Sequence, residues 1–280
     1  MGSFDGVHVG HAEVIRNTVD AARSENAQPA LITFEPHPRC VLDPANCPQS
    51  ITTLQEKLAL VESRGIEHAI VVRFDRALSA LSPQEFVDSL TAVMELRRWV
   101  VGFDFAFGHA RAGSAAWLRD HGHKVDVVPP VVIDGTALHS SDVRRLITLG
   151  DMDKANRLLG REYSMSGPVE AGDRVGRSLG FPTANIAIEP NKLVPALGAY
   201  AGRAAGRADD GQGAARHLDP VGETTQAAGA GQGRAAAAVV ADADREAAGR
   251  RVHAHRRGPG TGMLGHIGQA LRAEEIGQRP

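Results

Sequence analysis

The sequence predicts an α/β fold: a parallel, doubly wound sheet, then an incomplete antiparallel β-barrel and a disordered tail. Up to about residue 160, short apolar runs of strand length alternate with amphipathic helical segments, which is typical of a parallel sheet. From residue 161 to 203, strand-like segments are joined by Gly-rich turns without helices between them. From residue 204 to 280, Ala, Gly and Arg dominate, and no helical or strand period persists. We therefore expect two domains, 1–160 and 161–203, and a low-complexity tail over 204–280.

Two capping boxes mark helix starts in the first domain. Thr53 is followed three residues later by Glu56, and Ser82 is followed in the same way by Glu85. The second box predicts a helix that continues over residues 86–96. Strands are expected at residues 30–34, 69–72, 99–102 and 125–128 of the first domain, and at 163–171 and 183–188 of the second.

The bulk composition excludes several function classes. The 280 residues carry a formal net charge of −2, with a pI of about 6.6, which gives no basic field for nucleic acid or an anionic membrane. The chain has no run of about 18 apolar residues and no secretory leader, so we expect a cytoplasmic protein that binds neither nucleic acid nor membrane. Its two cysteines, Cys40 and Cys47, lack the His and Cys neighbours of a zinc site, and we expect reduced thiols.

A candidate phosphate site lies at residues 2–11, before a helix expected from Ala12 to Arg23. A helix N-terminus offers free N–H groups and the positive end of its dipole to phosphate. His8 and His11 are three residues apart and can donate hydrogen bonds to the same phosphates, which is the charge stabilisation that nucleotidyl transfer needs. The alternative is a polar loop with two solvated histidines. The candidate residues are Phe4, Asp5, Gly6, His8, Gly10 and His11.

Two further loops follow predicted strands, where ligands of open parallel sheets bind. In the first loop, two prolines fix a turn that can hold an aromatic ring and an imidazole against a ring system. The second combines three phenylalanines with glycines and an aspartate that can accept hydrogen bonds from hydroxyls or a base. The alternatives are a rigid turn, and core phenylalanines with an exposed Asp. The candidate residues are Phe34, Pro36 and His37 in the first loop and Asp104, Phe105 and Phe107 in the second.

Another helix is expected to begin within Leu138–Arg144. The hydroxyls of Ser140 and Ser141, the free N–H groups of the first turn and the Arg144 fork can together hold a pyrophosphate. The alternative is an ordinary helix cap with a surface arginine.

Residues 167–185 form a glycine-rich stretch that can fold over phosphates. The Thr183 hydroxyl and the Asn185 carbonyl are hard oxygen ligands, which suit Mg²⁺ that bridges the phosphates of ATP. The alternative is a Gly-rich region of β-turns. The candidate ATP-binding residues are Gly172, Gly176, Gly180 and Pro182.

Together these motifs resemble the bacterial bifunctional riboflavin kinase/FAD synthetase family. Residues 4–11, FDGVHVGH, resemble the FAD synthetase branch of the nucleotidylyltransferase superfamily, as do the segments TFEPHP and GFDFAFG. Ser140, Ser141 and Arg144 match a Ser-Ser-Thr-x-x-Arg segment in which His139 replaces the first Ser. Residues 167–185 resemble the riboflavin kinase signature with its PTAN motif. The resemblance implies a Rossmann-like nucleotidylyltransferase domain followed by part of a riboflavin kinase barrel.

The resemblance also implies two reactions and their ligands. Riboflavin and ATP give FMN and ADP, and FMN and ATP then give FAD and pyrophosphate, with Mg²⁺ as the metal. His8, His11 and Arg144 are the implied catalytic residues, because they stabilise charge on the triphosphate. The implied partners are these small molecules, and no oligomeric state follows.

The chain departs from the family pattern at both ends of the resemblance, which covers about residues 2–203. Met1 precedes Gly2 where the family carries a strand, so we expect a marginal first domain that makes FAD poorly. After Arg203 neither the family's Asn-Pro-Thr segment nor its general-base Glu is found, so we expect the kinase activity to be lost. The composition of the tail is that of a GC-rich gene read out of frame. The nucleotide sequence of the gene would test this hypothesis. The alternatives are another HxGH transferase, and an inactive product with residual nucleotide binding.

Overall fold

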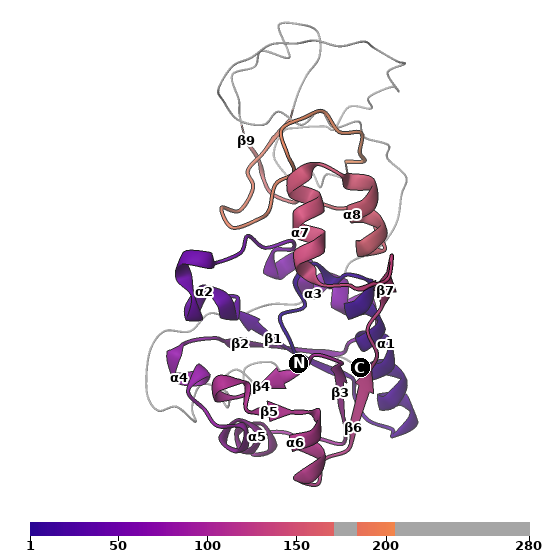
Figure 1. The fold of residues 1–280 in the computed structure, drawn as a ribbon. Coiled ribbons are helices and arrows are strands. Elements are labelled where there is room, and N and C mark those ends of the chain that lie inside the picture. Colours follow the sequence, from indigo (N-terminus) through magenta and orange to yellow (C-terminus); the bar gives the residue numbers. More distant parts are fainter. Residues whose placement is uncertain (171–183, 205–280) are drawn as a thin grey trace, which may run out of the picture. The chain divides into compact units, whose positions relative to one another are not determined.

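The computed structural model describes residues 1–170 and 184–204, whose helices and strands are drawn in Figure 1. These residues belong to two compact units. The first contains residues 1–163 and 190–194, and the second contains the other described residues. The predicted kinase residues Gly172, Gly176, Gly180, Pro182 and Thr183 lie outside the described residues, as does the predicted tail from residue 205 onward.

The first unit is built on two pairs of parallel strands (Figure 1). β1 (Ala30–Glu35) pairs with β2 (His68–Arg73), and β3 (Trp99–Gly102) pairs with β6 (Val125–Val128). All four strands lie where the apolar runs predicted them, and the parallel α/β prediction is confirmed. These four strands form two separate pairs, however, and not the one continuous sheet that was expected.

The longer helices of this unit alternate with these strands along the chain, except that the last two follow one another. They are α1 (Val9–Ser24), α3 (Leu54–Glu62), α5 (Pro83–Thr91), α6 (Ala115–Asp120), α7 (Ser140–Leu149) and α8 (Met152–Leu159). Both predicted capping boxes are confirmed, at Thr53 before α3 and at Ser82 before α5. α5 was predicted to extend to residue 96, but it ends at Thr91. It ends early because the chain closes into a tighter turn, in which the N–H groups of residues 93 and 94 share one carbonyl acceptor.

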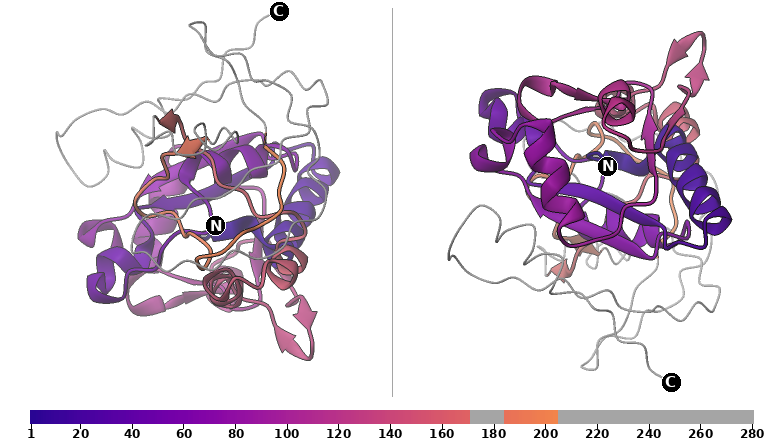
Figure 2. Two further views of the ribbon diagram at one scale, coloured as in Figure 1. Left: turned by 90° about the horizontal axis from the view of Figure 1, so that it is seen from above. Right: turned by 90° about the horizontal axis from the view of Figure 1, so that it is seen from below.

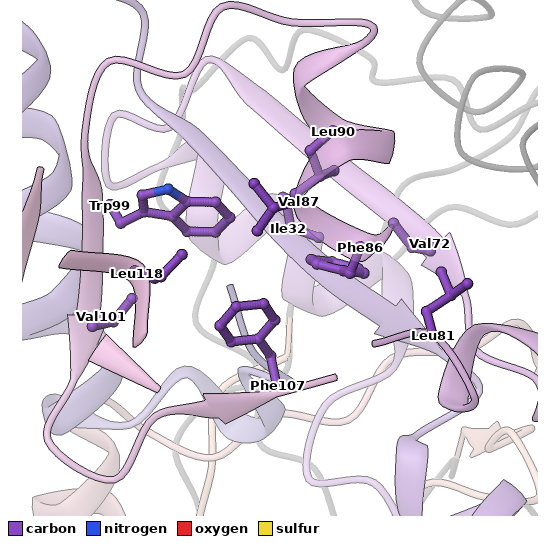
Figure 3. Close-up of a cluster of buried hydrophobic side chains, with 10 residues drawn as sticks. All are labelled: Ile32, Val72, Leu81, Phe86, Val87, Leu90, Trp99, Val101, Phe107 and Leu118. Atoms are coloured by element: carbon purple, nitrogen blue, oxygen red, sulfur yellow. The ribbon is translucent and has the colours of Figure 1, made fainter. Parts of the chain in front are cut away.

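Helical side chains cover both faces of the β1–β2 pair. Leu31 and Ile32 are neighbours in β1, so their side chains point to opposite faces. Leu31 packs in one cluster with side chains of α1 and α3. Ile32 packs in another with side chains of α5, α6 and β3, which Figure 3 shows. α1 also packs against β3 and β6 (Figure 2). Each fully buried large apolar side chain contributes about 1.5–3 kcal/mol, so these two layers supply much of the unit's stability.

Short elements complete the described chain, and none of its helices is both long and apolar enough to cross a bilayer. The 3-10 turns are η1 (Asp5–Val7), η2 (Pro44–Asn46) and η3 (His109–Arg111), and the short helices are α2 (Pro38–Leu42) and α4 (Arg76–Ser79). The short strands are β4 (Ala106–Phe107) with β5 (Gly113–Ser114), and β7 (Val132–Ile133) with β8 (Thr136–Ala137).

The prediction of two reduced cysteines is wrong, because Cys40 and Cys47 form a disulfide. α2 and η2 turn the chain back on itself between them, and the two Cα atoms come within 4.2 Å. Two cysteines without clustered neighbours in the sequence therefore still meet in space.

In the second unit, β9 (Val169–Glu170) pairs antiparallel with β10 (Asn185–Ile186). The predicted antiparallel pairing is confirmed here, but each strand is far shorter than the predicted 163–171 and 183–188. Asn185 lies directly opposite Glu170 in this pair. The barrel stays a prediction, since the described residues of this unit contain one strand pair.

Candidate active site

The loop that precedes α1 contains three residues with positive φ angles. Phe4 has a φ of 47°, Val7 of 39°, and Gly6 between them of 79°. Residues with a Cβ rarely adopt this left-handed region, and such strain concentrates at functional sites. A Cβ on Gly6 would lie 2.9 Å from Cγ2 of Ile51, so only glycine fits there. The loop is therefore held in one shape at a local cost in stability.

His8 and His11 meet at the start of α1, as the motif predicted. His8 is the N-cap of the helix, and its Nδ1 accepts a hydrogen bond from the His11 N–H at 3.3 Å. The two rings stack, with their centroids 3.7 Å apart. A Cβ on Gly10 would lie 3.1 Å from Cε1 of His8, so the glycine lets this ring pack closely against the helix.

Burial keeps both imidazoles neutral. His8 is 4% exposed, and burial lowers its pKa to about 4. Burial, followed by the charge of His8, lowers the pKa of His11 well below its ordinary value. Since Nδ1 of the neutral His8 ring accepts a hydrogen bond, its proton lies on Nε2, which can donate to a ligand. The pair therefore offers a hydrogen bond and not a positive charge.

The Asp5 carboxylate joins three segments that are far apart in the sequence. It is 3% exposed and accepts hydrogen bonds from the N–H groups of Ile51 and Thr52, each at 3.1 Å. It also pairs with Arg144, whose Nη2 lies 2.7 Å from Oδ2. Asp5 was predicted to bind phosphate, but its oxygens are engaged by donors of the protein itself.

α7 begins beside this loop. The Ser140 hydroxyl donates to the Asp5 carbonyl at 3.0 Å, and Arg144 Nε donates to the Gln49 carbonyl at 3.0 Å. Ser141 is exposed. His139, the N-cap of α7, lies close enough to influence the pKa of His8. The structure therefore brings together the two helix starts that the motifs predicted to share a site.

The loop that carries Asp104 reaches the start of α7 in part. Asp104 Oδ2 lies 3.9 Å from Nδ1 of His139, and the Phe103 ring lies 6.0 Å from the His139 ring. Phe107, by contrast, is 7% exposed in the core cluster of Figure 3, and Phe105 packs against that cluster. The structure thus places the two predicted pocket rings in or beside the core and leaves the exposed Phe103 near α7.

The predicted loop after β1 lies at the same end of the unit. Phe34, which was predicted in this loop, lies instead in β1 and packs partly buried against the core, and Pro36 follows the end of the strand. His37 is the N-cap of α2, and burial lowers its pKa. The charges of Asp5 and Arg144 also act on that pKa, so His37 lies near the pair at the centre of the site.

Sequence reasoning missed two basic residues of this region. Lys57 on α3 is 5% exposed, and its Nζ donates to Thr33 Oγ1 at 3.3 Å. Arg161 donates to the carbonyl oxygens of Gly6 at 2.8 Å and Val7 at 3.2 Å, and these hydrogen bonds stabilise the strained loop. The signal for Lys57 was a lysine on the apolar face of a predicted helix.

Comparison with known families identifies the protein family of this chain. A family model for FAD synthetase matches residues 1–142. The chain belongs to the FAD synthetase family. A model for riboflavin kinase matches residues 159–255, so this second match continues past Arg203, where the motif resemblance stops.

Curated relatives of this FAD synthetase family member are named bifunctional riboflavin kinase/FMN adenylyltransferase. The protein of Listeria monocytogenes is 38% identical over 207 residues, which are 72% of this chain and 65% of the relative. The protein of Bacillus subtilis is 35% identical over 208 residues, which are 73% of this chain and 66% of the relative. The chain therefore spans slightly less than two thirds of the length of these relatives.

A solved structure shares the fold. The crystal structure described as a macrolide-efflux protein from Streptococcus pneumoniae matches with a TM-score of 0.65 at 30% identity. The match covers 71% of this chain and 66% of the other.

Proposed function

We propose that this chain transfers the adenylyl group of ATP to FMN, which yields FAD and pyrophosphate. The observation that carries the proposal is the meeting of two helix starts around Asp5. One brings the stacked His8–His11 pair, and the other brings Ser140 and Arg144. Helix N-termini attract phosphate, and two of them at one place suit a reaction between two phosphate esters.

In this reaction a phosphate oxygen of FMN attacks the α-phosphorus of ATP in line. A new P–O bond forms, and the bond to the leaving pyrophosphate breaks. Negative charge grows on the leaving group, so fixed donors aimed at it lower the barrier. The Nε2–H of His8 and the Arg144 fork are proposed to supply these donors. No covalent nucleophile is required.

The loops around this centre are proposed to border the substrates' larger groups. Asp104 has the chemistry to accept hydrogen bonds from hydroxyls or a base. The segment from Phe34 to His37 offers a ring and an imidazole beside the phosphate loop. Phe105 and Phe107 are proposed to support the Asp104 loop from the core and not to touch the ligand themselves.

ATP is proposed to enter as its Mg²⁺ complex, in which the ion neutralises part of the triphosphate charge. Across residues 1–170 and 184–204, no group of three or more His, Cys, Asp or Glu side chains could hold a metal. The phosphates and water would therefore supply most ligands, as is common for Mg²⁺. In the second unit, Asn185 and Glu170 are oxygen-bearing residues at paired positions, which supports the proposed metal role of Asn185 there.

The test is FAD formation by the full chain from FMN and Mg-ATP, followed by chromatography, with pyrophosphate release measured in parallel. We expect FAD and pyrophosphate in equal amounts. Pyrophosphate release with another phosphate ester, but not with FMN, would favour a different HxGH transferase. Nucleotide binding without any product would favour the inactive alternative.

Riboflavin phosphorylation is proposed to be absent or very weak in this chain. No Asn-Pro-Thr segment follows Arg203, and the four glutamates after it stand in no motif that would mark one of them as the general base. Loss of a general base typically lowers a rate about 10²–10⁴-fold. FMN formation from riboflavin and Mg-ATP at the rate of one of the curated relatives would contradict this. The cytoplasm is the proposed location of this chain.

A further inference from the structure

Lys57 is a buried lysine that the predicted site did not include. It is 5% exposed. Among the described residues, its one hydrogen-bond partner is Thr33 Oγ1. None of the ion pairs within the described part of the chain includes it. An ammonium group has three N–H donors, so two of them remain for another acceptor.

The neighbours of Lys57 come from two loops of the proposed site. Its charge acts on His11 of the phosphate loop and on His37 after β1. Asp5 of the phosphate loop and Glu35 at the end of β1 act in turn on Lys57. Thr33 Oγ1, which accepts from Lys57, donates in turn to the Ser3 carbonyl at 3.1 Å. The ammonium therefore lies beside the loop proposed for the ATP phosphates, near the end of the strand that leads into the loop proposed to border the flavin.

Two other cations of this region are paired with carboxylates. Arg144 pairs with Asp5 at 2.7 Å. Lys192, which is 2% exposed, pairs with Glu56 and also donates to the Ile51 carbonyl at 2.7 Å. Both site histidines are neutral. The half-buried Arg161 forms no salt bridge either, but it donates to the main-chain carbonyls of Gly6 and Val7. Among the described site residues, Lys57 is thus the fully buried cation without a carboxylate salt bridge, and burial of such a charge is costly.

We propose that Lys57 binds the phosphate groups that react, as a cation between the triphosphate of ATP and the phosphate of FMN. The inference rests on the proposed adenylyl transfer. Two anionic phosphates repel each other on approach, and a fixed cation between them offsets that repulsion. A bound anion would in turn give the buried ammonium the direct ion pair that Asp5 and Glu35 do not form with it.

The first test measures binding by titration calorimetry to the full chain, with Lys57→Met beside Lys192→Met as a matched buried control. The probes are inorganic pyrophosphate, FMN and riboflavin, which separate the ATP side from the flavin phosphate and from the flavin ring. Lys57→Met should weaken pyrophosphate or FMN binding at least about tenfold and leave riboflavin binding unchanged. Lys57→Arg should restore much of this affinity. Lys192→Met should lower the melting temperature and leave all three affinities near those of the wild type.

A folded Lys57→Met protein that binds pyrophosphate and FMN like the wild type would overturn the inference and give Lys57 a structural role. If the wild type forms FAD and yet Lys57→Met keeps its affinities, only this inference fails. If the wild type binds neither probe, the proposed function fails with it.

A second measurement needs no variant. It therefore tests the inference even if the Lys57→Met protein does not fold. An amine-modifying reagent is applied to the wild type with and without pyrophosphate or FMN, and the labelled lysines are identified by mass spectrometry. Either ligand should protect Lys57 and leave the exposed Lys154 unchanged. Equal labelling of Lys57 in every condition would overturn the inference.

Discussion

The starts of α1 and α7 offer phosphate-binding groups in opposite ways. α1 begins with two stacked, neutral imidazoles, of which His8 is buried and His11 is half-buried, and they follow a loop strained by positive φ angles. α7 begins with the partly exposed His139 and the exposed Ser141. The first start is therefore fixed before a ligand arrives, and the second retains donors that can still adjust. We expect changes at α1 to affect stability and rate together, and changes at α7 to separate them.

The largest expected effect is at Asp5, which couples the two helix starts. Asp5→Ala removes the partner of Arg144 and leaves the N–H groups of Ile51 and Thr52 without their acceptor. Because a buried charge is then uncompensated, the free energy of unfolding should fall by about 3–5 kcal/mol, measured by urea denaturation. Asp20→Ala is the control, since Asp20 makes exposed ion pairs on α1 and should cost less than about 1 kcal/mol. Equal losses in both variants would mean that Asp5 does not couple the helix starts.

The next effect concerns the rate of the proposed reaction. His8→Asn retains a side-chain oxygen that can accept the His11 N–H as a helix cap, but removes the Nε2–H donor. If this donor stabilises the leaving pyrophosphate, kcat for FAD formation should fall about 10²–10³-fold while KM changes little. Steady-state kinetics with Mg-ATP and FMN measure both parameters. A change confined to KM would assign His8 to ground-state binding instead.

The contacts behind these two predictions differ in how well they can be predicted from local sequence. The pairing of His8 with His11 follows from local spacing, since residues three apart lie on one side of a helix turn. The strands at 30–34 and 99–102 follow equally from local apolar runs, and the capping boxes from fixed offsets. The role of Asp5 depends on contacts with residues 46 to 139 positions away, which no local pattern encodes.

The other misses have the same origin. Phe107 follows a glycine-rich pattern that suits a pocket, but tertiary packing buries it among Phe86, Trp99 and Trp117. Cys40 and Cys47 meet only because α2 and η2 reverse the chain. Both outcomes depend on three-dimensional packing, which motif spacing does not specify.

The third effect is a loss of stability in mild acid, and it belongs to the α1 side of the comparison. The pKa of His8 is about 4 in the folded chain and about 6.5 when unfolded, so the unfolded state takes up a proton first. The contribution of His8 to stability is fully present above pH 6.5 and is lost as the pH falls toward 4. Its full size is on the order of 3 kcal/mol. The shift at His11 acts in the same direction.

Urea denaturation at a series of pH values across this window measures the effect. His8→Asn should flatten the pH dependence, because asparagine does not titrate. An equally steep loss in the variant would show that other groups dominate the acid sensitivity.

The smallest effect separates two adjacent serines at the start of α7. Ser140→Ala removes one hydrogen bond to the Asp5 carbonyl, and should lower the free energy of unfolding by about 1 kcal/mol. Ser141→Ala changes an exposed residue, and should leave stability within about 0.5 kcal/mol of the wild type. If the exposed hydroxyl is kept for a ligand, affinity should show the reverse order, with Ser141→Ala weakening pyrophosphate binding by about fivefold, the value of one hydrogen bond. Thermal melts and calorimetric titration of each variant give both quantities. If Ser141→Ala leaves the pyrophosphate affinity unchanged, Ser141 is not a ligand donor. The contribution of α7 to phosphate binding would then come from Arg144, which Asp5 already holds in place.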